Sequence, residues 1–113
     1  MDINFTGYNE KVLTFIADGT LKEGVSGIVV KVTASGTVGK ANEDDIFLGV
    51  LLSVRNGYAS VQTSGYVKVN TASKIPVGAK ILSADSEGGV YATEKGRQCF
   101  VLDSTPTQAG ILI

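Results

Sequence analysis

The side chains that most often perform acid–base or metal chemistry are scarce in this sequence. It contains no histidine, the commonest general base, a frequent metal ligand and the usual activator of a catalytic serine or cysteine. Serine and threonine are numerous, but none stands in a Gly-x-Ser-x-Gly elbow. A Gly-x-x-x-x-Gly-Lys phosphate loop is also missing. We therefore expect no enzyme activity and no cofactor.

Two acidic segments are candidates for metal binding. Residues 43–45 read Glu-Asp-Asp, and residues 85–88 read Asp-Ser-Glu-Gly. A calcium loop places oxygen ligands at alternating positions around a sharp glycine turn. The first segment lacks that spacing, and the second is too short and bridges two expected strands. We interpret both as solvated turns and expect no metal site.

Residues 93–99 hold the remaining reactive side chains. The segment Thr93-Glu94-Lys95-Gly96-Arg97 carries both charge signs and is interpreted as a surface loop rather than a catalytic group. Cys99 is the only cysteine, so no intrachain disulfide can form. Its apolar neighbours predict a buried strand thiol, and Arg97 would lie on the same strand face.

Charge and hydropathy exclude two classes of partner. Lys and Arg total 10 against 11 Asp and Glu, without a basic stripe, so phosphate-driven nucleic-acid binding is not expected. Apolar runs stay far below the roughly 20 residues that cross a bilayer, so we expect no membrane association. The polar N-terminal segment does not resemble a signal peptide, which predicts synthesis and assembly in a cytoplasm.

Glycine placement predicts an all-β fold. The chain has 14 glycines and only 2 prolines, and the glycines separate short runs rich in β-branched residues. Residues 9–17 favour a strand, with a short helix as the alternative. Later residues predict a small β-barrel or β-sandwich of hairpins, with an N-terminal arm over residues 1–11 and one β-domain over residues 12–113.

Several turns and one central strand are specified locally. Ser35-Gly36, Asn56-Gly57 and residues 86–88 predict hairpin turns, of which Asn-Gly is the strongest signal. Residues 46–54 are almost continuously apolar and predict a strand buried on both faces. Gly49 within it indicates a bulge or a close approach of another backbone. Gly65 fits either a turn or a bulge in one bent strand.

A weak internal repeat suggests two related halves of about 52 residues. Three segments recur at that constant offset, 77 − 25, 88 − 36 and 99 − 47. They are residues 25–30 with 77–82, residues 36–38 with 88–90, and residues 47–50 with 99–102. Two such units that close on one another would leave few open sheet edges. Regular strand spacing can also imitate a repeat by chance.

The order of these signals resembles the small head-decoration (capsid cement) proteins of tailed bacteriophages and prophages. The resemblance lies in a polar N-terminal segment Asn-Phe-Thr-Gly-Tyr-Asn, a Gly-Val-Ser-Gly-Ile-Val-Val strand start, the Phe-Leu-Gly-Val strand and Val-Gln-Thr-Ser-Gly-Tyr-Val-Lys-Val. A Val-Gly-Ala-Lys-Ile-Leu strand start and the apolar C-terminus Ala-Gly-Ile-Leu-Ile complete it. The family often has Asp after the second Val-Gly, where this chain has Ala79.

The resemblance implies a non-enzymatic structural protein that binds the outer face of an assembled capsid and stabilises it. Its partners would be the major capsid protein and further copies of the chain, with a homotrimer favoured, on a virion assembled in the bacterial cytoplasm. The arm would supply capsid or subunit contacts through Ile3, Phe5 and Tyr8. Strand addition to a capsid edge would place Ile3 and Phe5 on one side.

A small ligand-binding barrel is the alternative. An OB-like fold would use Tyr58 and Tyr66 to stack on a sugar or on single-stranded nucleic acid. Such a groove is normally basic as well as aromatic, and this chain carries no basic stripe.

Overall fold

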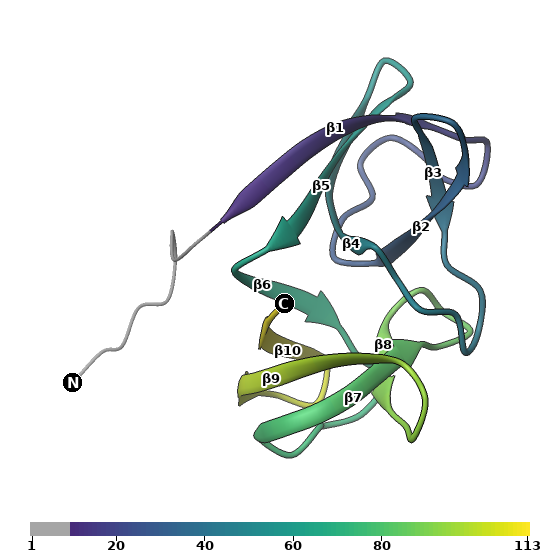
Figure 1. Cartoon of the computed structure of the whole chain (residues 1–113). Coiled ribbons are helices and arrows are strands. Elements are labelled where there is room, and N and C mark those ends of the chain that lie inside the picture. The colour runs from purple at the N-terminus through teal and green to yellow at the C-terminus, as the bar shows by residue number, and fades with distance from the viewer. Residues whose placement is uncertain (1–9) are drawn as a thin grey trace.

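The computed structural model describes residues 10–113, which form ten strands and no helix (Figure 1). No helix in this part of the chain could span a bilayer. The expected all-β class is therefore confirmed. The strands are β1 (Lys11–Ala17), β2 (Val29–Ala34), β3 (Thr37–Lys40), β4 (Gly49–Arg55), β5 (Tyr58–Ser64), β6 (Tyr66–Asn70), β7 (Gly78–Ala84), β8 (Val90–Ala92), β9 (Arg97–Ser104) and β10 (Gln108–Leu112).

The first half of the chain, β1 to β5, is a closed barrel in the order β1-β3-β2-β4-β5. Parallel pairing of β1 with β3 and antiparallel pairing of β1 with β5 close it. Asn56 and Gly57 connect β4 to β5 with φ angles of 51° and 81°. Both angles are positive, as a type I′ turn requires, so the predicted Asn-Gly hairpin is confirmed.

Gly49 lets β4 and β5 approach each other closely. A Cβ atom at this position would lie 2.3 Å from the carbonyl oxygen of Gln62 and 2.9 Å from Cγ1 of Val61. The backbone oxygen cannot rotate away, so any side chain must push the strands apart. This confirms the expected close approach of another backbone.

Gly49→Ala is expected to lower the free energy of unfolding by about 2–3 kcal/mol, because overpacking displaces the β4–β5 pair. Gly19→Ala is the matched control, since no heavy atom lies within 4 Å of its added Cβ. Urea unfolding followed by circular dichroism measures both variants. Equal stabilities for the two would contradict the close approach at Gly49.

The second half, β6 to β10, forms a five-stranded sheet in the order β6-β10-β9-β7-β8 (Figure 1). The chain passes from the barrel into this sheet at Gly65, whose φ is +92°. Its N–H and C=O both pair with the backbone of Ile113, at 3.1 Å each. Gly65 is thus a bend between two strands that belong to different sheets.

The two halves share one strand order. Starting at β3, the barrel runs β3-β2-β4-β5-β1, and starting at β8, the second sheet runs β8-β7-β9-β10-β6. Each strand therefore has a counterpart five places later in the chain. A parallel bridge from Thr71 to Val90 matches the parallel pairing of β1 with β3. A bulge also recurs, after Leu51 in β4 and after Val101 in β9. The predicted related halves therefore agree with the topology.

Register refines the expected offset of 52 residues. Val38 and Val90 keep it, at 90 − 38 = 52. The recurring bulge instead aligns Leu51 with Val101, at 101 − 51 = 50. The sequence-based alignment of residues 47–50 with 99–102 is therefore shifted by two residues. The cause is that the loops before β4 and β9 differ in length.

Two hydrophobic cores stabilise the molecule. The first-half core lies inside the barrel, and the other joins inward residues of the second half to four residues of the first: Val29, Ala41, Phe47 and Val50. Backbone hydrogen bonds also join the halves, including one of 2.8 Å from the N–H of Val29 to the carbonyl of Gly88. The halves are therefore continuous in both packing and hydrogen bonding.

Two expected boundaries are wrong. The predicted strand over residues 46–54 begins only at Gly49, and Ile46 is 66% exposed, so the segment is not buried on both faces throughout. The predicted N-terminal arm included Lys11, but Lys11 opens β1 and pairs with Ser64. The structure therefore does not support an extended arm that reaches residue 11.

Candidate functional site

The predicted contact residues Ile3, Phe5 and Tyr8 lie outside the described residues, so their role stays a prediction. The other predicted positions are all described.

Both acidic segments bind their own backbone. Asp45 forms an ion pair of 2.9 Å with Lys31 and accepts a hydrogen bond from the N–H of Asn42, and the Lys31 contact lowers the pKa of Asp45. Asp85 accepts hydrogen bonds from the N–H groups of Glu87 and Gly89. These carboxylates fix turns, and no group of three metal-ligating side chains occurs within residues 10–113.

Arg97 has a role that the sequence did not reveal. Its guanidinium donates to the carbonyls of Phe47 at 3.2 Å, Leu48 at 2.6 Å and Thr63 at 3.2 Å. It also lies 5.8 Å from the centre of the Phe47 ring. Arg97 is thus half-buried between the halves and is not part of a free surface loop. The signal in the sequence was the spacing of two residues between Arg97 and Cys99, which places both side chains on the inward face of β9.

Cys99 is buried in β9 as a free thiol, as predicted. Burial raises its pKa to about 11, against a smaller opposing effect of the Arg97 charge. At pH 8 roughly one native thiol in a thousand would be ionised, and the thiolate is the reactive form.

Native Cys99 is therefore expected to resist Ellman's reagent at about pH 8, and to react with one equivalent in concentrated guanidinium chloride. Because its ordinary pKa of 9.0 is raised in the folded state, the thiol should also lower stability as pH rises above about 9. Free cysteine serves as the control for reagent activity. Rapid stoichiometric labelling of the native protein would contradict this.

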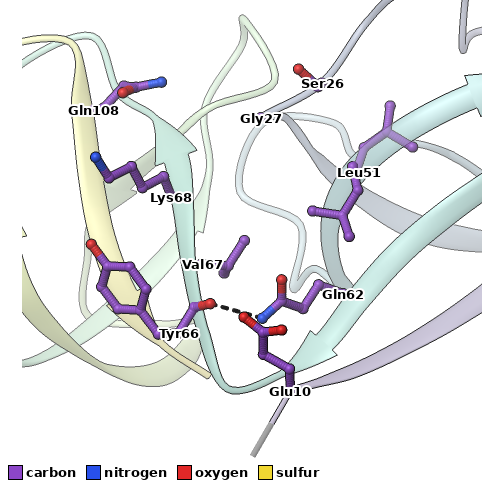
Figure 2. Close-up of a pocket in the computed structure, with 10 residues that line it drawn as sticks. Glu10, Ser26, Gly27, Leu51, Gln62, Tyr66, Val67, Lys68 and Gln108 are labelled. Atoms are coloured by element: carbon purple, nitrogen blue, oxygen red, sulfur yellow. Dashed lines mark hydrogen bonds between the residues drawn. The ribbon is translucent and has the colours of Figure 1, made fainter. Parts of the chain in front are cut away.

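A groove of about 410 Å³ lies between the two halves. Figure 2 shows Leu51 and Gly27 on its barrel side, Tyr66, Lys68 and Gln108 on its second-sheet side, and Glu10 at one end.

Gln62 lies at the floor of this groove, and its amide nitrogen donates to the carbonyls of Ser64 at 3.0 Å and Tyr66 at 2.8 Å (Figure 2). The bond to Tyr66 joins the halves, and the bond to Ser64 lies within β5. The amide hydrogens of Gln62 are therefore used within the protein.

Tyr58 and Tyr66, the predicted stacking residues, have different environments. Tyr66 donates a hydrogen bond of 2.7 Å to Asp103, and burial followed by this contact raises its pKa to about 12. Tyr58 is 57% exposed and lies opposite Ile16, which is also exposed. The structure does not bring the two tyrosines together on neighbouring strands.

Exposed apolar side chains gather on two regular faces. Along β1, Val12 and Ile16 are exposed on the outward face, and Leu13 is exposed on the opposite side of the strand. The second face, which we call the β7–β9 face, lies on the outside of the second half and includes Ile81 and Phe100. Large apolar side chains on regular strands favour contact with another macromolecule.

Comparison of the sequence with models of known families and with curated proteins finds no match.

Proposed function

We propose that this chain is a non-enzymatic structural protein that binds the outer face of an assembled phage capsid and stabilises it, as a homo-oligomer with a trimer favoured. The observation that carries the binding role is the exposure of large apolar side chains along β1 and on the β7–β9 face. The capsid as partner follows from the resemblance in the order of sequence signals.

The geometry is compatible with a lattice-binding role. Many modest contacts repeated over a capsid add up without a deep pocket, since each bound copy stabilises only the assembled state. The carboxylates of Asp45 and Asp85, which belong to the two acidic segments considered for metal binding, accept backbone hydrogen bonds within turns. We therefore propose that the chain acts by binding through its exposed surfaces.

Co-sedimentation with expanded, undecorated capsids of the phage that encodes the chain tests the proposal. We expect saturable binding to expanded shells, weakened at least tenfold by the double variant Ile3→Ser and Phe5→Ser. Val32→Ser, at an exposed apolar position of the barrel, is the control and should bind normally. No binding to expanded or immature shells would overturn the proposal.

A ligand-binding barrel is the second candidate, favoured by the exposed ring of Tyr58 beside Ile16. Aromatic stacking on a base is typical of proteins that bind single strands. Titration with an oligothymidylate at low salt, followed by tyrosine fluorescence, tests it. Saturable quenching that Tyr58→Ser abolishes would support this candidate, and a flat titration would exclude its nucleic-acid form.

A further inference from the structure

The turn between β4 and β5 combines a reactive pair of residues with open surroundings. Asn56 and Gly57 are both exposed. Apart from its chain neighbours, no heavy atom lies within 4 Å of the position that a Cβ on Gly57 would occupy. Within residues 10–113, neither the side-chain amide of Asn56 nor the N–H of Gly57 has a hydrogen-bond partner. The two groups that would react with each other are therefore free.

An asparagine that precedes glycine can lose its side-chain amide with water as the sole co-reactant. The backbone nitrogen of Gly57 attacks Cγ of Asn56, the Cγ–Nδ2 bond breaks, and ammonia leaves with the proton of the attacking N–H. Water then opens the five-membered imide at one of its two carbonyls, which yields aspartate or isoaspartate. Glycine favours the attack because it has no Cβ to hinder the nitrogen.

The backbone of Asn56 is close to the conformation that this ring requires. Ring closure sets ψ of the asparagine to about −120°, the ψ that a type II′ turn has at its first central residue together with a φ of about +60°. The φ of Asn56 is 51°. Types I′ and II′ both connect strands as two-residue hairpins, and glycine tolerates either sign of φ. Rotation of the single peptide group between Asn56 and Gly57 therefore reaches the reactive geometry while β4 and β5 stay paired.

Asp18-Gly19 is the other place in the chain where an aspartate or asparagine precedes glycine. The carboxylate of Asp18 accepts hydrogen bonds from the N–H and the hydroxyl of Thr20, and the hydroxyl contact lowers the pKa of Asp18. Imide formation at an aspartate requires the neutral acid, because the ionised carboxylate lacks a leaving group. The fold therefore holds Asp18 in its unreactive form.

The other described asparagines are less reactive for local reasons. Asn42 precedes Glu43, whose side chain hinders the backbone nitrogen that would attack. Asn70 precedes Thr71, which is β-branched and whose N–H already donates to the carbonyl of Thr107 at 2.9 Å. Among the described residues, the combination of a glycine nitrogen and a free amide therefore occurs at one turn alone.

We infer that Asn56 deamidates spontaneously in the folded protein and gives aspartate and isoaspartate at the β4–β5 turn. Either product adds a carboxylate next to Glu23, whose Oε1 accepts a hydrogen bond of 2.8 Å from the N–H of Asn56. Isoaspartate also lengthens the main chain of a turn that fits two residues, and the carbonyl of Gly57 binds the N–H of Ala17 in β1. The modification therefore loosens the closure of the barrel, and it does not depend on capsid binding.

Peptide mapping of the folded chain, aged at mildly alkaline pH, tests the inference. Cleavage after lysine releases residues 41–68 as one peptide that contains both Asn42 and Asn56, so the control residue is analysed in the same spectrum. Fragmentation by mass spectrometry should find Asn56 converted at least tenfold faster than Asn42. Equal conversion of the two would overturn the inference. A rate more than a hundredfold below that of the chain in concentrated urea would also overturn it, because the hairpin would then prevent the rotation.

Two variants assign the reaction to this pair of residues. Gly57→Ala puts a side chain beside the attacking nitrogen and should slow the conversion at least tenfold. Because alanine is strained at the φ of +81° found here, circular dichroism establishes that this variant is folded. Asn56→Gln keeps a neutral amide but would form a larger ring more slowly, so its aged form should not gain the negative charge that ion exchange detects in the wild type. An equal gain of charge in Asn56→Gln would place the reaction elsewhere and overturn the inference.

Discussion

Phe47→Ala is expected to lower the free energy of unfolding by about 3–5 kcal/mol, the typical cost of truncating a buried aromatic side chain. Phe47 is 1% exposed and belongs to the core that both halves build. The cavity would open where the barrel meets the second sheet, next to Val50 and beneath the Arg97 guanidinium. Collapse around it is restricted, because backbone hydrogen bonds hold both sides in place.

Ile46→Ala is the matched control, because Ile46 is the preceding residue and is exposed. It should change stability by less than about 0.5 kcal/mol, as surface substitutions usually do. Guanidinium unfolding monitored by circular dichroism compares the two variants. If Phe47→Ala proved as mild as Ile46→Ala, the core between the halves would not be what joins them.

Local turn chemistry explains why much of the fold was predictable. Asn56-Gly57 and Ser35-Gly36 turn where the sequence placed them, because each turn depends on residues that are adjacent in the chain. Long-range pairing was not predictable. The parallel contact of Ile16 with Thr37 closes the barrel across a distance in sequence that no local pattern encodes. For the same reason, the sequence does not decide between a turn and a bulge at Gly65.

The sequence does not indicate which strand faces are exposed, because the apolar runs are continuous. Residues 99–102 read Cys-Phe-Val-Leu, which indicates a strand with two apolar faces but not whether both are covered. The structure buries Cys99 and Val101 and leaves Phe100 exposed. Which face is covered depends on how the halves pack. Sequence reasoning therefore placed its candidate contacts at Ile3, Phe5 and Tyr8 and did not find the β7–β9 face.

Arg97→Met is expected to lower the free energy of unfolding by about 2–3 kcal/mol, since hydrogen bonds from a charged donor are strong and the acceptors left behind are partly buried. The three acceptors belong to Phe47, Leu48 and Thr63, all in the first half, while Arg97 itself opens β9 of the second. The substitution retains the apolar length of the side chain, so the loss reports the guanidinium contacts.

Arg97→Lys distinguishes geometry from charge. Lysine keeps the positive charge but has one nitrogen, whereas the two Nη atoms of Arg97 reach carbonyls on separate segments. We expect lysine to recover less than half of the loss in urea unfolding, and Arg55→Met, at an exposed position of β4, to cost little. Full recovery by lysine would mean that charge near the Phe47 ring, and not the fork of donors, holds the halves together. A loss of unfolding free energy no larger than that of Arg55→Met would mean that Arg97 does not help to hold the two halves together.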